Sequence, residues 1–154
     1  MLRHAVSEDV SDVYAVFQTY PHIFPHMRFD RTQRLVAAGQ CIWQDGVVIT
    51  YQTYQKTVRL GDYVAPRGSI CLHQIVKSAT AVAGAAARIF TIFIRDYVPT
   101  RLVLSVRADN TSAWQFYERH GLQRIGNVRW QQQGHPLPGY VYEWIRPVES
   151  LPFN

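Results

Sequence analysis

Short strand-like segments alternate with helical ones in the second half of the chain, and this alternation constrains the fold more than any other feature of the sequence. Residues 69–76 and 101–107 are short apolar runs bounded by turn residues, a pattern typical of strands. Between them, residues 84–96 carry apolar side chains on nearly every side, and only Arg88 and Arg95 share a face left for solvent. Strands that alternate with such helices predict a mixed sheet with helices on both faces, and they exclude a helical bundle or a sandwich.

A hairpin occupies the middle of the chain. Asp45-Gly46 is a strong two-residue turn signal between the β-rich runs 41–44 and 47–60. Periodicity and turn residues place the other elements. These are a strand at 2–6, a helix that Ser7 caps and that ends near Tyr20, a helix at 28–38, a loop at 61–68, a helix at 111–120, and strands at 122–130 and 139–146 joined by the loop QQQGHPLPG.

Length and charge narrow the possible functions. The chain has 154 residues, which predicts one domain spanning 1–154. Its net charge of +5 favours an anionic partner such as a phosphorylated cofactor, but no run of basic residues marks a nucleic-acid tail. The N-terminus lacks the apolar core of a signal peptide, and no apolar stretch is long enough to span a bilayer. Cys41 and Cys71 show no disulfide framework and no metal-ligand spacing, so we expect a cytoplasmic protein without a metal or a membrane partner.

The stretch LVLSVRADNTSAWQFYERHGLQRIG joins a strand to a helix and carries a spaced motif. It places Asn110 after the strand, Ala113 three positions on, the aromatic pair Phe116-Tyr117, and Gly121 at the helix end. Together with the order of elements, this motif resembles the GCN5-related N-acetyltransferases, the GNAT family. The resemblance implies an α/β (α+β) fold with a central mixed, mostly antiparallel twisted sheet of six to seven strands, helices on both faces, and acetyl-CoA (coenzyme A) as the cofactor.

The resemblance implies roles for two residues of this motif. In the family, a tyrosine at the position of Tyr117 protonates the departing thiolate, and an asparagine at the position of Asn110 contacts the pantetheine arm of the cofactor. A proton donor beside the sulfur makes the thiolate a better leaving group. Another interpretation stays open, because Ala113, Phe116, Tyr117 and His120 also form an i, i+3, i+4, i+7 stripe typical of core residues, and Asn110 suits a helix N-cap.

A second motif of the family is the cofactor loop, in which backbone N–H groups at a helix start hold the pyrophosphate. Gly84 and Ala86 take its Gly-x-Gly/Ala positions, and counting back places Val76 at the end of the preceding strand. The Gln/Arg position of the motif is Ala81, which lacks a charged arm, and Lys77, Ser78, Thr80 or Arg88 are the candidates to compensate. The cofactor-binding half then covers about 68–125, with contacts from Ile75, Val76, Lys77, Val82, Ala83, Gly84, Ala85, Ala86, Asn110, Ala113 and Phe116.

The catalytic base is the least determined part of the predicted site. Many family members use a glutamate on the strand before the cofactor loop, whereas SICLHQIV offers no carboxylate. His73 is the best candidate there, since imidazole titrates near neutrality. A lone strand histidine is also often only a hydrogen-bonded structural residue. Other candidates are His22 and His26, in a loop that lines the acceptor site in the family, and Glu143 on the last strand, whereas an acetyl-cysteine at Cys71 is not expected.

The loop with His22 and His26 also holds Phe24, and we assign these three residues to acceptor binding, with an anchored hydrophobic loop as the other interpretation of Phe24. The predicted activity is direct transfer of an acetyl group from acetyl-CoA to a primary amine on a small molecule or a protein, in a possible homodimer. The alternatives are a CoA-binding or regulatory module with reduced catalysis, which the missing Gln/Arg and carboxylate favour, and a nucleic-acid-directed member, which the basic, aromatic run YQTYQKTVRL suggests.

Overall fold

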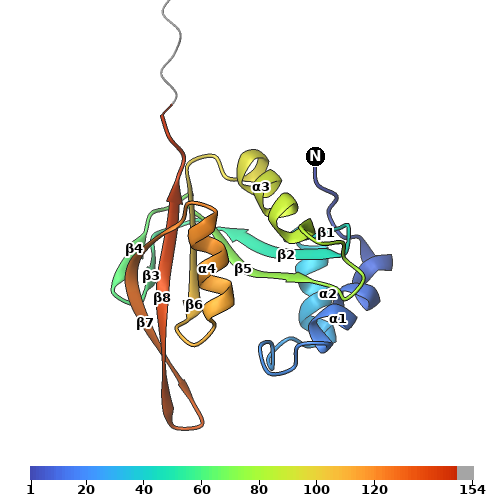
Figure 1. Cartoon of the computed structure of the whole chain (residues 1–154), viewed down its shortest axis with the longest axis horizontal. Coiled ribbons are helices and arrows are strands. Elements are labelled where there is room, and N and C mark those ends of the chain that lie inside the picture. Colours follow the sequence, from blue (N-terminus) through green and yellow to red (C-terminus); the bar gives the residue numbers. More distant parts are fainter. Residues whose placement is uncertain (149–154) are drawn as a thin grey trace, which may run out of the picture. The chain divides into compact units, whose positions relative to one another are not determined.

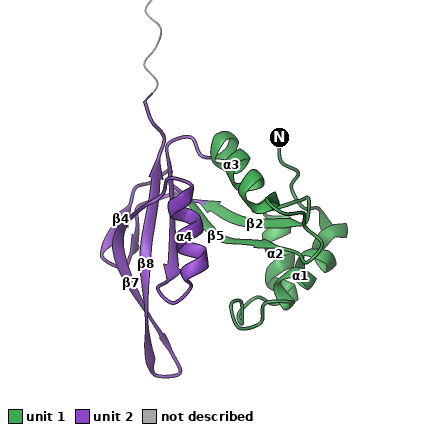
Figure 2. Ribbon diagram, viewed as in Figure 1, with its two compact units in different colours: residues 1–52, 71–97 green, residues 53–70, 98–154 purple. Residues whose placement is uncertain are grey.

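The computed structural model describes residues 1–148, and their contacts divide the chain into two compact units (Figure 2). The first unit combines Met1–Gln52 with Cys71–Tyr97. The second combines Thr53–Ile70 with the residues from Val98 onward. Each unit is therefore built from two separate stretches of sequence, so the predicted cofactor-binding half at 68–125 draws on both units.

The first unit holds three strands in the order β1-β2-β5 (Figure 1). Asp45 and Gly46 both have positive φ angles, 53° and 77°, which is the backbone that a two-residue hairpin turn requires. The turn fixes the register from Gln44 opposite Val47 to Cys41 opposite Thr50. The elements of this unit are η1 (Ser7–Asp9), α1 (Val10–Gln18), α2 (Phe29–Ala37), β1 (Cys41–Gln44), β2 (Val47–Thr53), β5 (Ile70–Lys77) and α3 (Ala85–Tyr97).

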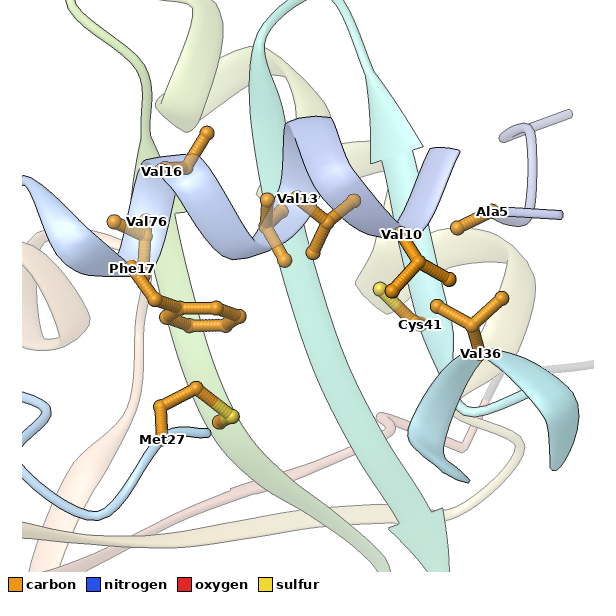
Figure 3. Close-up of a cluster of buried hydrophobic side chains, with 10 residues drawn as sticks. Ala5, Val10, Val13, Val16, Phe17, Met27, Val36, Cys41 and Val76 are labelled. Carbon is orange, nitrogen blue, oxygen red and sulfur yellow. The ribbon is translucent and has the colours of Figure 1, made fainter. Parts of the chain in front are cut away.

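Helices cover both faces of these three strands. On one face, α1 and α2 pack against the strands through a cluster of buried side chains (Figure 3), which are Ala5, Val10, Val13, Val16, Phe17, Met27, Val36, Cys41, Val48 and Val76. On the other face, Phe93 of α3 lies edge-on to Tyr51 of β2, with ring centroids 5.2 Å apart. Val48 and Tyr51 point to opposite faces because side chains alternate along a strand. The predicted helices on both faces are thereby confirmed for this unit.

The second unit holds strands β6, β8 and β7 in that order, all antiparallel, and a separate β3-β4 hairpin. The hairpin is attached by Tyr63, whose hydroxyl donates to Glu143 Oε2 at 2.8 Å, while Arg101 donates to the same oxygen at 3.1 Å. The elements of this unit are β3 (Val58–Leu60), β4 (Tyr63–Ala65), β6 (Arg101–Arg107), α4 (Thr111–Arg119), β7 (Gln123–Gln132) and β8 (His135–Ile145).

The helix α4 is attached by polar and aromatic contacts, since Tyr117 is its only buried residue. The guanidinium carbon of Arg124 lies 3.6 Å from the ring centroid of Tyr140 and 5.4 Å from that of Trp114. The Tyr142 hydroxyl donates to Glu118 Oε2 at 2.6 Å and accepts from Arg124. One guanidinium thus connects α4 to β7 and β8.

The predicted fold class is confirmed, namely a mixed, mostly antiparallel sheet of six strands with helices. Near the N-terminus two predictions are wrong. Residues 2–6 contribute only an isolated bridge from His4 to Ile42, because the chain turns into η1 too soon for a strand to extend. Ser7 does not cap the helix with its side chain, since the backbone N–H of Val6 donates to the Asp9 carboxylate instead.

Three further boundaries differ from the prediction. The strand expected at 47–60 breaks after Thr53, where Tyr54 turns away to exchange backbone hydrogen bonds with Gly68 and Ser69. The expected loop at 61–68 contains β4, because Gly61-Asp62 forms a tight hairpin turn that the sequence reading overlooked.

The expected loop QQQGHPLPG is instead the tip of the β7-β8 hairpin, turning at Gln133-Gly134 with positive φ at both residues. Its two prolines are tolerated because residues 135–138 of β8 extend past the paired part of β6, which begins opposite Gly139.

Candidate active site

The end of β5 carries the first group of predicted site residues, all within the first unit. The Val76 side chain is buried in the apolar cluster, so at this position only its main chain is left for contact with a ligand. Ile75 is half-buried and Lys77 is exposed. The hydroxyl of Tyr20 donates to the Lys77 carbonyl at 2.8 Å. The structure therefore brings the loop after α1, predicted to bind the acceptor, to the end of the predicted cofactor strand.

The segment between β5 and α3 is a compact loop of small residues. Ala81 N–H donates to the Ser78 carbonyl at 3.1 Å, and Ala85 N–H donates to the Val82 carbonyl at 3.1 Å. Gly84 has a φ of +82°, a conformation that side chains rarely adopt, and a Cβ added there would meet no described atom within 4 Å. The loop is thus open on the side of Gly84, and Val82 and Ala83 are exposed beside it.

The start of α3 leaves backbone donors for a ligand. The first helical hydrogen bond of this end runs from Arg88 N–H to the Gly84 carbonyl at 3.1 Å. The N–H groups of Ala86 and Ala87, in the turn before it, consequently have no intrahelical acceptor. Backbone N–H groups and the positive end of the helix dipole favour an anion at such a position. Small side chains and an open glycine let a diphosphate approach these donors, so the chemistry of the loop fits coenzyme A.

The side chains around the loop make two polar contacts within the protein. Ser78 Oγ and Thr80 Oγ1 lie 3.0 Å apart. Arg88 pairs with Asp45 of the β1-β2 turn at 2.9 Å, and both side chains are about half exposed. Lys77 and Arg88 are the cationic side chains closest in sequence to the loop. Ala81 has no side-chain donor.

The second group of predicted site residues lies on α4, within the second unit. Asn110 occupies the N-cap position but makes no side-chain capping hydrogen bond, so capping does not explain this residue. Ala113 and Phe116 are half-buried, and the Phe116 ring lies 4.3 Å from the His120 ring by centroid. One side of the helix carries Ala113, Phe116, Tyr117 and His120, as the spacing predicts.

Tyr117 is buried, and burial raises the pKa of its phenol above the ordinary tyrosine value. The phenol consequently keeps its proton at neutral pH. A protonated phenol is the form that a proton donor to a leaving thiolate requires. Burial is also what a core aromatic residue shows, so both interpretations of Tyr117 predicted from the sequence are compatible with its position.

His73 reaches solvent from β5, yet the protein around it is dense enough to perturb its titration. Burial of the ring lowers the pKa of His73, and the positive charge of Arg31 on α2 lowers it further. At neutral pH the imidazole is therefore neutral and carries a lone pair that can accept a proton. This is the state that a general base needs.

The loop between α1 and α2 contains the three predicted acceptor residues. Phe24 packs edge-on against Phe17 with centroids 5.3 Å apart and approaches Tyr20 at 6.5 Å, so its contacts are those of a loop anchor. His22 and His26 are exposed. The structure does not bring these two histidines into any described hydrogen bond, and their predicted role in acceptor binding stays a prediction.

Two other candidates from the sequence have structural roles in the fold. Glu143 accepts hydrogen bonds from Tyr63 and Arg101, so its carboxylate is engaged within the second unit. Cys71 is buried in the first unit, with its thiol directed at the Leu72 carbonyl at 3.9 Å. A buried thiol is a poor nucleophile, and the expected absence of an acetyl-cysteine stays a prediction.

Sequence reasoning missed two contacts that shape the first group. In the sequence Tyr20 marks only the end of a helix, whereas in the structure its hydroxyl connects the acceptor loop to β5. The Asp45-Gly46 turn was identified as a hairpin signal, whereas it also contacts the cofactor loop through a 2.7 Å hydrogen bond from Ser78 N–H to the Gly46 carbonyl. Both contacts join segments far apart in the sequence, which local patterns do not reveal.

The described residues, 1–148, offer neither a metal cluster nor a membrane-spanning helix. No three His, Cys, Asp or Glu side chains gather there in a way that suits a metal ion. None of the helices in this range has both the length and the apolar character needed to cross a bilayer.

No protein-family model and no curated protein sequence matches the chain. Solved structures do match it. A GNAT-family acetyltransferase from Bacillus cereus is similar with a TM-score of 0.71 and 16% identity, covering 96% of this chain and 98% of that one. A ribosomal-protein-alanine N-acetyltransferase from Brucella melitensis has a TM-score of 0.71 and 14% identity, covering 95% and 99%. NAA60 from Arabidopsis thaliana, in complex with acetyl-CoA, has a TM-score of 0.67 and 14% identity, covering 94% and 97%.

These similarities extend over nearly the whole length of each chain. The protein therefore has the fold of the GNAT acetyltransferases, which confirms the resemblance stated from its sequence motifs. At these low identities the likeness establishes the fold, and the activity has to be argued from the residues of the chain itself.

Proposed function

We propose that the protein is an N-acetyltransferase that transfers an acetyl group from acetyl-CoA to a primary amine by direct attack. The observation that carries this proposal is the loop before α3. Gly84 is open and left-handed, and the N–H groups of Ala86 and Ala87 have no intrahelical acceptor. Coenzyme A has a diphosphate that such donors suit, and a structural neighbour, NAA60, is described in complex with acetyl-CoA.

In the proposed reaction the acetyl-CoA thioester lies along the main chain at the end of β5. The neutral amine nitrogen attacks the thioester carbonyl carbon, a C–N bond forms, and the C–S bond breaks. The N–H of Val76 donates to the carbonyl oxygen, whose negative charge grows during the attack. The buried side chain of Val76 supports this role, because packing in the cluster fixes its main chain in place.

Two side chains move protons in this proposal. His73 takes the proton that the acceptor nitrogen must lose once its C–N bond has formed, directly or through a water molecule, and its lowered pKa keeps it neutral for that step. Tyr117 gives its phenolic proton to the leaving thiolate, and its raised pKa keeps that proton available until the sulfur carries charge. One proton leaves the nitrogen and one reaches the sulfur, and the pair returns to its starting state when the imidazolium of His73 loses its proton and the phenolate of Tyr117 regains one.

Asn110, Ala113 and Phe116 are proposed to line the pantetheine arm, while His22 and His26 are proposed to contact the acceptor. Asn110 suits such a contact because its amide is not used for capping. The acceptor is defined here only as a primary amine on a small molecule or a protein. The cytoplasmic location and the homodimer remain predictions of the sequence.

A second candidate is a CoA-binding module that has lost turnover. Ala81, in place of the Gln or Arg of the family motif, and the absence of a carboxylate on β5 favour this alternative. Binding and turnover therefore have to be measured separately.

The test is calorimetric titration of the protein with coenzyme A, followed by a thiol-release assay with acetyl-CoA over a panel of amines. We expect binding and release of thiol with at least one amine class. Gly84→Asp places a negative charge beside the proposed diphosphate and should abolish binding, since aspartate tolerates the left-handed backbone but repels the ligand. Gly68→Asp is the matched control, because Gly68 has a φ of +88° and equally open surroundings.

A wild-type protein that binds no coenzyme A would remove the proposed function altogether. Binding with no thiol release from any amine would favour the module instead. Equal affinities of the two glycine variants would place the ligand away from Gly84.

A further inference from the structure

The Asp45-Gly46 turn of the first unit contacts both ends of the loop before α3. At the start of the loop, the N–H of Ser78 donates to the Gly46 carbonyl at 2.7 Å. At its end, the Arg88 guanidinium, in the first turns of α3, pairs with the Asp45 carboxylate at 2.9 Å. One two-residue turn thus fixes two points between which the proposed diphosphate donors lie.

The middle of the loop also lies against this turn. A Cβ added to Gly46 would lie 2.7 Å from Ser78 Oγ, 3.1 Å from the Cβ of Ala81 and 3.2 Å from its Cα. Gly46 also has a φ of +77°, so a side chain there would be strained as well as crowded. The turn and the loop therefore pack so closely that glycine is needed on one side and a small residue on the other.

We infer that the Asp45-Gly46 turn positions the cofactor loop, so that Gly46, Asp45 and Arg88 control the affinity for coenzyme A without touching the chemistry. The inference rests on the proposed function and goes beyond it, because it assigns the role to a hairpin outside the loop. Backbone donors bind an anion well only when they are held in the correct relative positions before binding. A loop without a Gln or Arg at position 81 has fewer contacts of its own to hold it, and the turn supplies external ones.

The exposed Asp45–Arg88 pair is too solvent-accessible to contribute much to the stability of the fold. Because the pair joins the turn to α3, it instead orients the start of α3 relative to the turn. Gly46 contributes more, because both its carbonyl and the space above its Cα are used by the loop. Binding of the cofactor is consequently expected to respond to these residues more than the free energy of unfolding does.

The first experiment compares Gly46→Ala with Gly39→Ala by titration with coenzyme A. Gly39 is the matched control, since it lies in the same unit with a φ of +70° and has no atom within 4 Å of an added Cβ. Both variants carry the same backbone strain, but only Gly46→Ala displaces the loop. We expect the dissociation constant of Gly46→Ala to rise roughly tenfold, the loss that follows when about one backbone hydrogen bond to the diphosphate is broken.

Kinetics separates a role in cofactor affinity from a role in overall stability, and hydrogen exchange reports on the loop itself. Gly46→Ala should raise KM for acetyl-CoA while leaving kcat and the KM for the amine close to wild type. Amide exchange of residues 78–84 should be faster in the unliganded Gly46→Ala protein than in Gly39→Ala. This second measurement does not depend on any ligand.

The Asp45–Arg88 ion pair is tested with three variants, Asp45→Asn, Arg88→Ala and Arg88→Lys. Asparagine keeps the left-handed backbone of position 45, and lysine keeps a cation that can reach Asp45. We expect Asp45→Asn and Arg88→Ala to weaken binding by about twofold to threefold, the scale of an exposed ion pair, and Arg88→Lys to restore much of the loss. Asp45→Asn also removes a negative charge near an anionic ligand. Tighter binding in this variant would contradict a positioning role for the Asp45–Arg88 pair.

The outcomes separate the two proposals. If wild-type protein binds coenzyme A and the two alanine variants of Gly46 and Gly39 bind equally with equal exchange rates, this inference is overturned and the proposed function stands. If wild-type protein binds none, the proposed function fails, and with it the role of the turn in cofactor affinity.

Discussion

The helices α3 and α4 are held in their respective units by different kinds of contact. In the first unit, α3 buries five residues, four of them large and apolar: Ala85, Ile89, Phe90, Phe93 and Ile94. In the second, α4 buries only Tyr117, and its other contacts include those with Arg124, Tyr140 and Tyr142 and a hydrogen bond from Trp114 to the Ala108 carbonyl. The attachment of α3 therefore depends on nondirectional apolar burial, whereas that of α4 depends more on directional hydrogen bonds and a cation over aromatic rings.

This contrast matches the parts that we propose for each unit. Apolar burial fixes a main chain, and the proposed contacts of the first unit with the cofactor are mostly main-chain contacts. Directional contacts orient side chains, and the second unit is proposed to supply the phenol of Tyr117. The comparison fails if truncation of a buried apolar side chain hardly lowers the stability of the first unit. It also fails if polar substitutions leave the stability and turnover that depend on the second unit unchanged.

The largest expected effect is that of Phe17→Ala in the first unit. The Phe17 side chain is 1% exposed, and its loss should lower the free energy of unfolding by about 3–5 kcal/mol, as for other buried aromatic residues. Urea denaturation measures the change. Phe29→Ala is the control, because Phe29 is 44% exposed and should change stability far less. Similar losses in both variants would mean that the cluster is not the main support of this unit.

The next effect concerns the phenol proposed to act in the second unit. Tyr117→Phe keeps the buried ring but removes the proton, so kcat should fall roughly a hundredfold while the affinity for coenzyme A stays the same. Tyr142→Phe is the matched control in the same unit, since it removes a hydroxyl that bonds Glu118 and Arg124. That control should lose about 1 kcal/mol of stability and little turnover. Equal rates for Tyr117→Phe and wild type would exclude Tyr117 as the acid.

A smaller effect is a shift in pH dependence. If His73 is the base, kcat/KM falls as the pH drops through its pKa, which lies below the ordinary histidine value because of burial and Arg31. Arg31→Gln removes one cause of that lowering, so the acidic limb should move to higher pH. His73→Gln should remove this limb and lower the rate. If the acidic limb of the kcat/KM profile is the same in both variants as in wild type, the base is another group or water.

The smallest stability effect distinguishes engaged from exposed charges. Glu143→Gln should lower the free energy of unfolding by about 1–2 kcal/mol, because it weakens the partly buried contacts with Tyr63 and Arg101. Asp30→Asn, which loses only the exposed pairs with Arg28 and Arg34, should change nothing measurable. Denaturation at low and high salt checks both, and an equal response would mean that the Glu143 network is as weak as a surface pair.

Strong local signals made most of the fold predictable. The Asp45-Gly46 hairpin and the strand at 101–107 match the structure, because turn residues and periodicity act over a few neighbouring residues. The β3-β4 hairpin was missed because the alternating run before it suggested one long strand. The tip of β7-β8 was missed because Gln133 adopts a φ of 52°, which local sequence does not favour.

The candidate site was predictable in part for the same reason. Motif spacing placed Gly84 at the start of one helix and Tyr117 within another, as the structure has them, whereas their roles in the site stay predictions. The contacts around them depend on packing between distant segments, as with Tyr20 and Lys77, which are 57 positions apart. No local pattern encodes such a contact.

The burial of the Val76 side chain also bears on how this sequence can diverge. If a peptide N–H at this position and those at the start of α3 recognise the ligand, almost any side chain that packs preserves recognition, because every residue supplies the same amide. Such a site requires few particular residue types in the sequence. The fold can then persist while the sequence changes, and this chain has the fold of the solved structures above at identities of 16% and 14%.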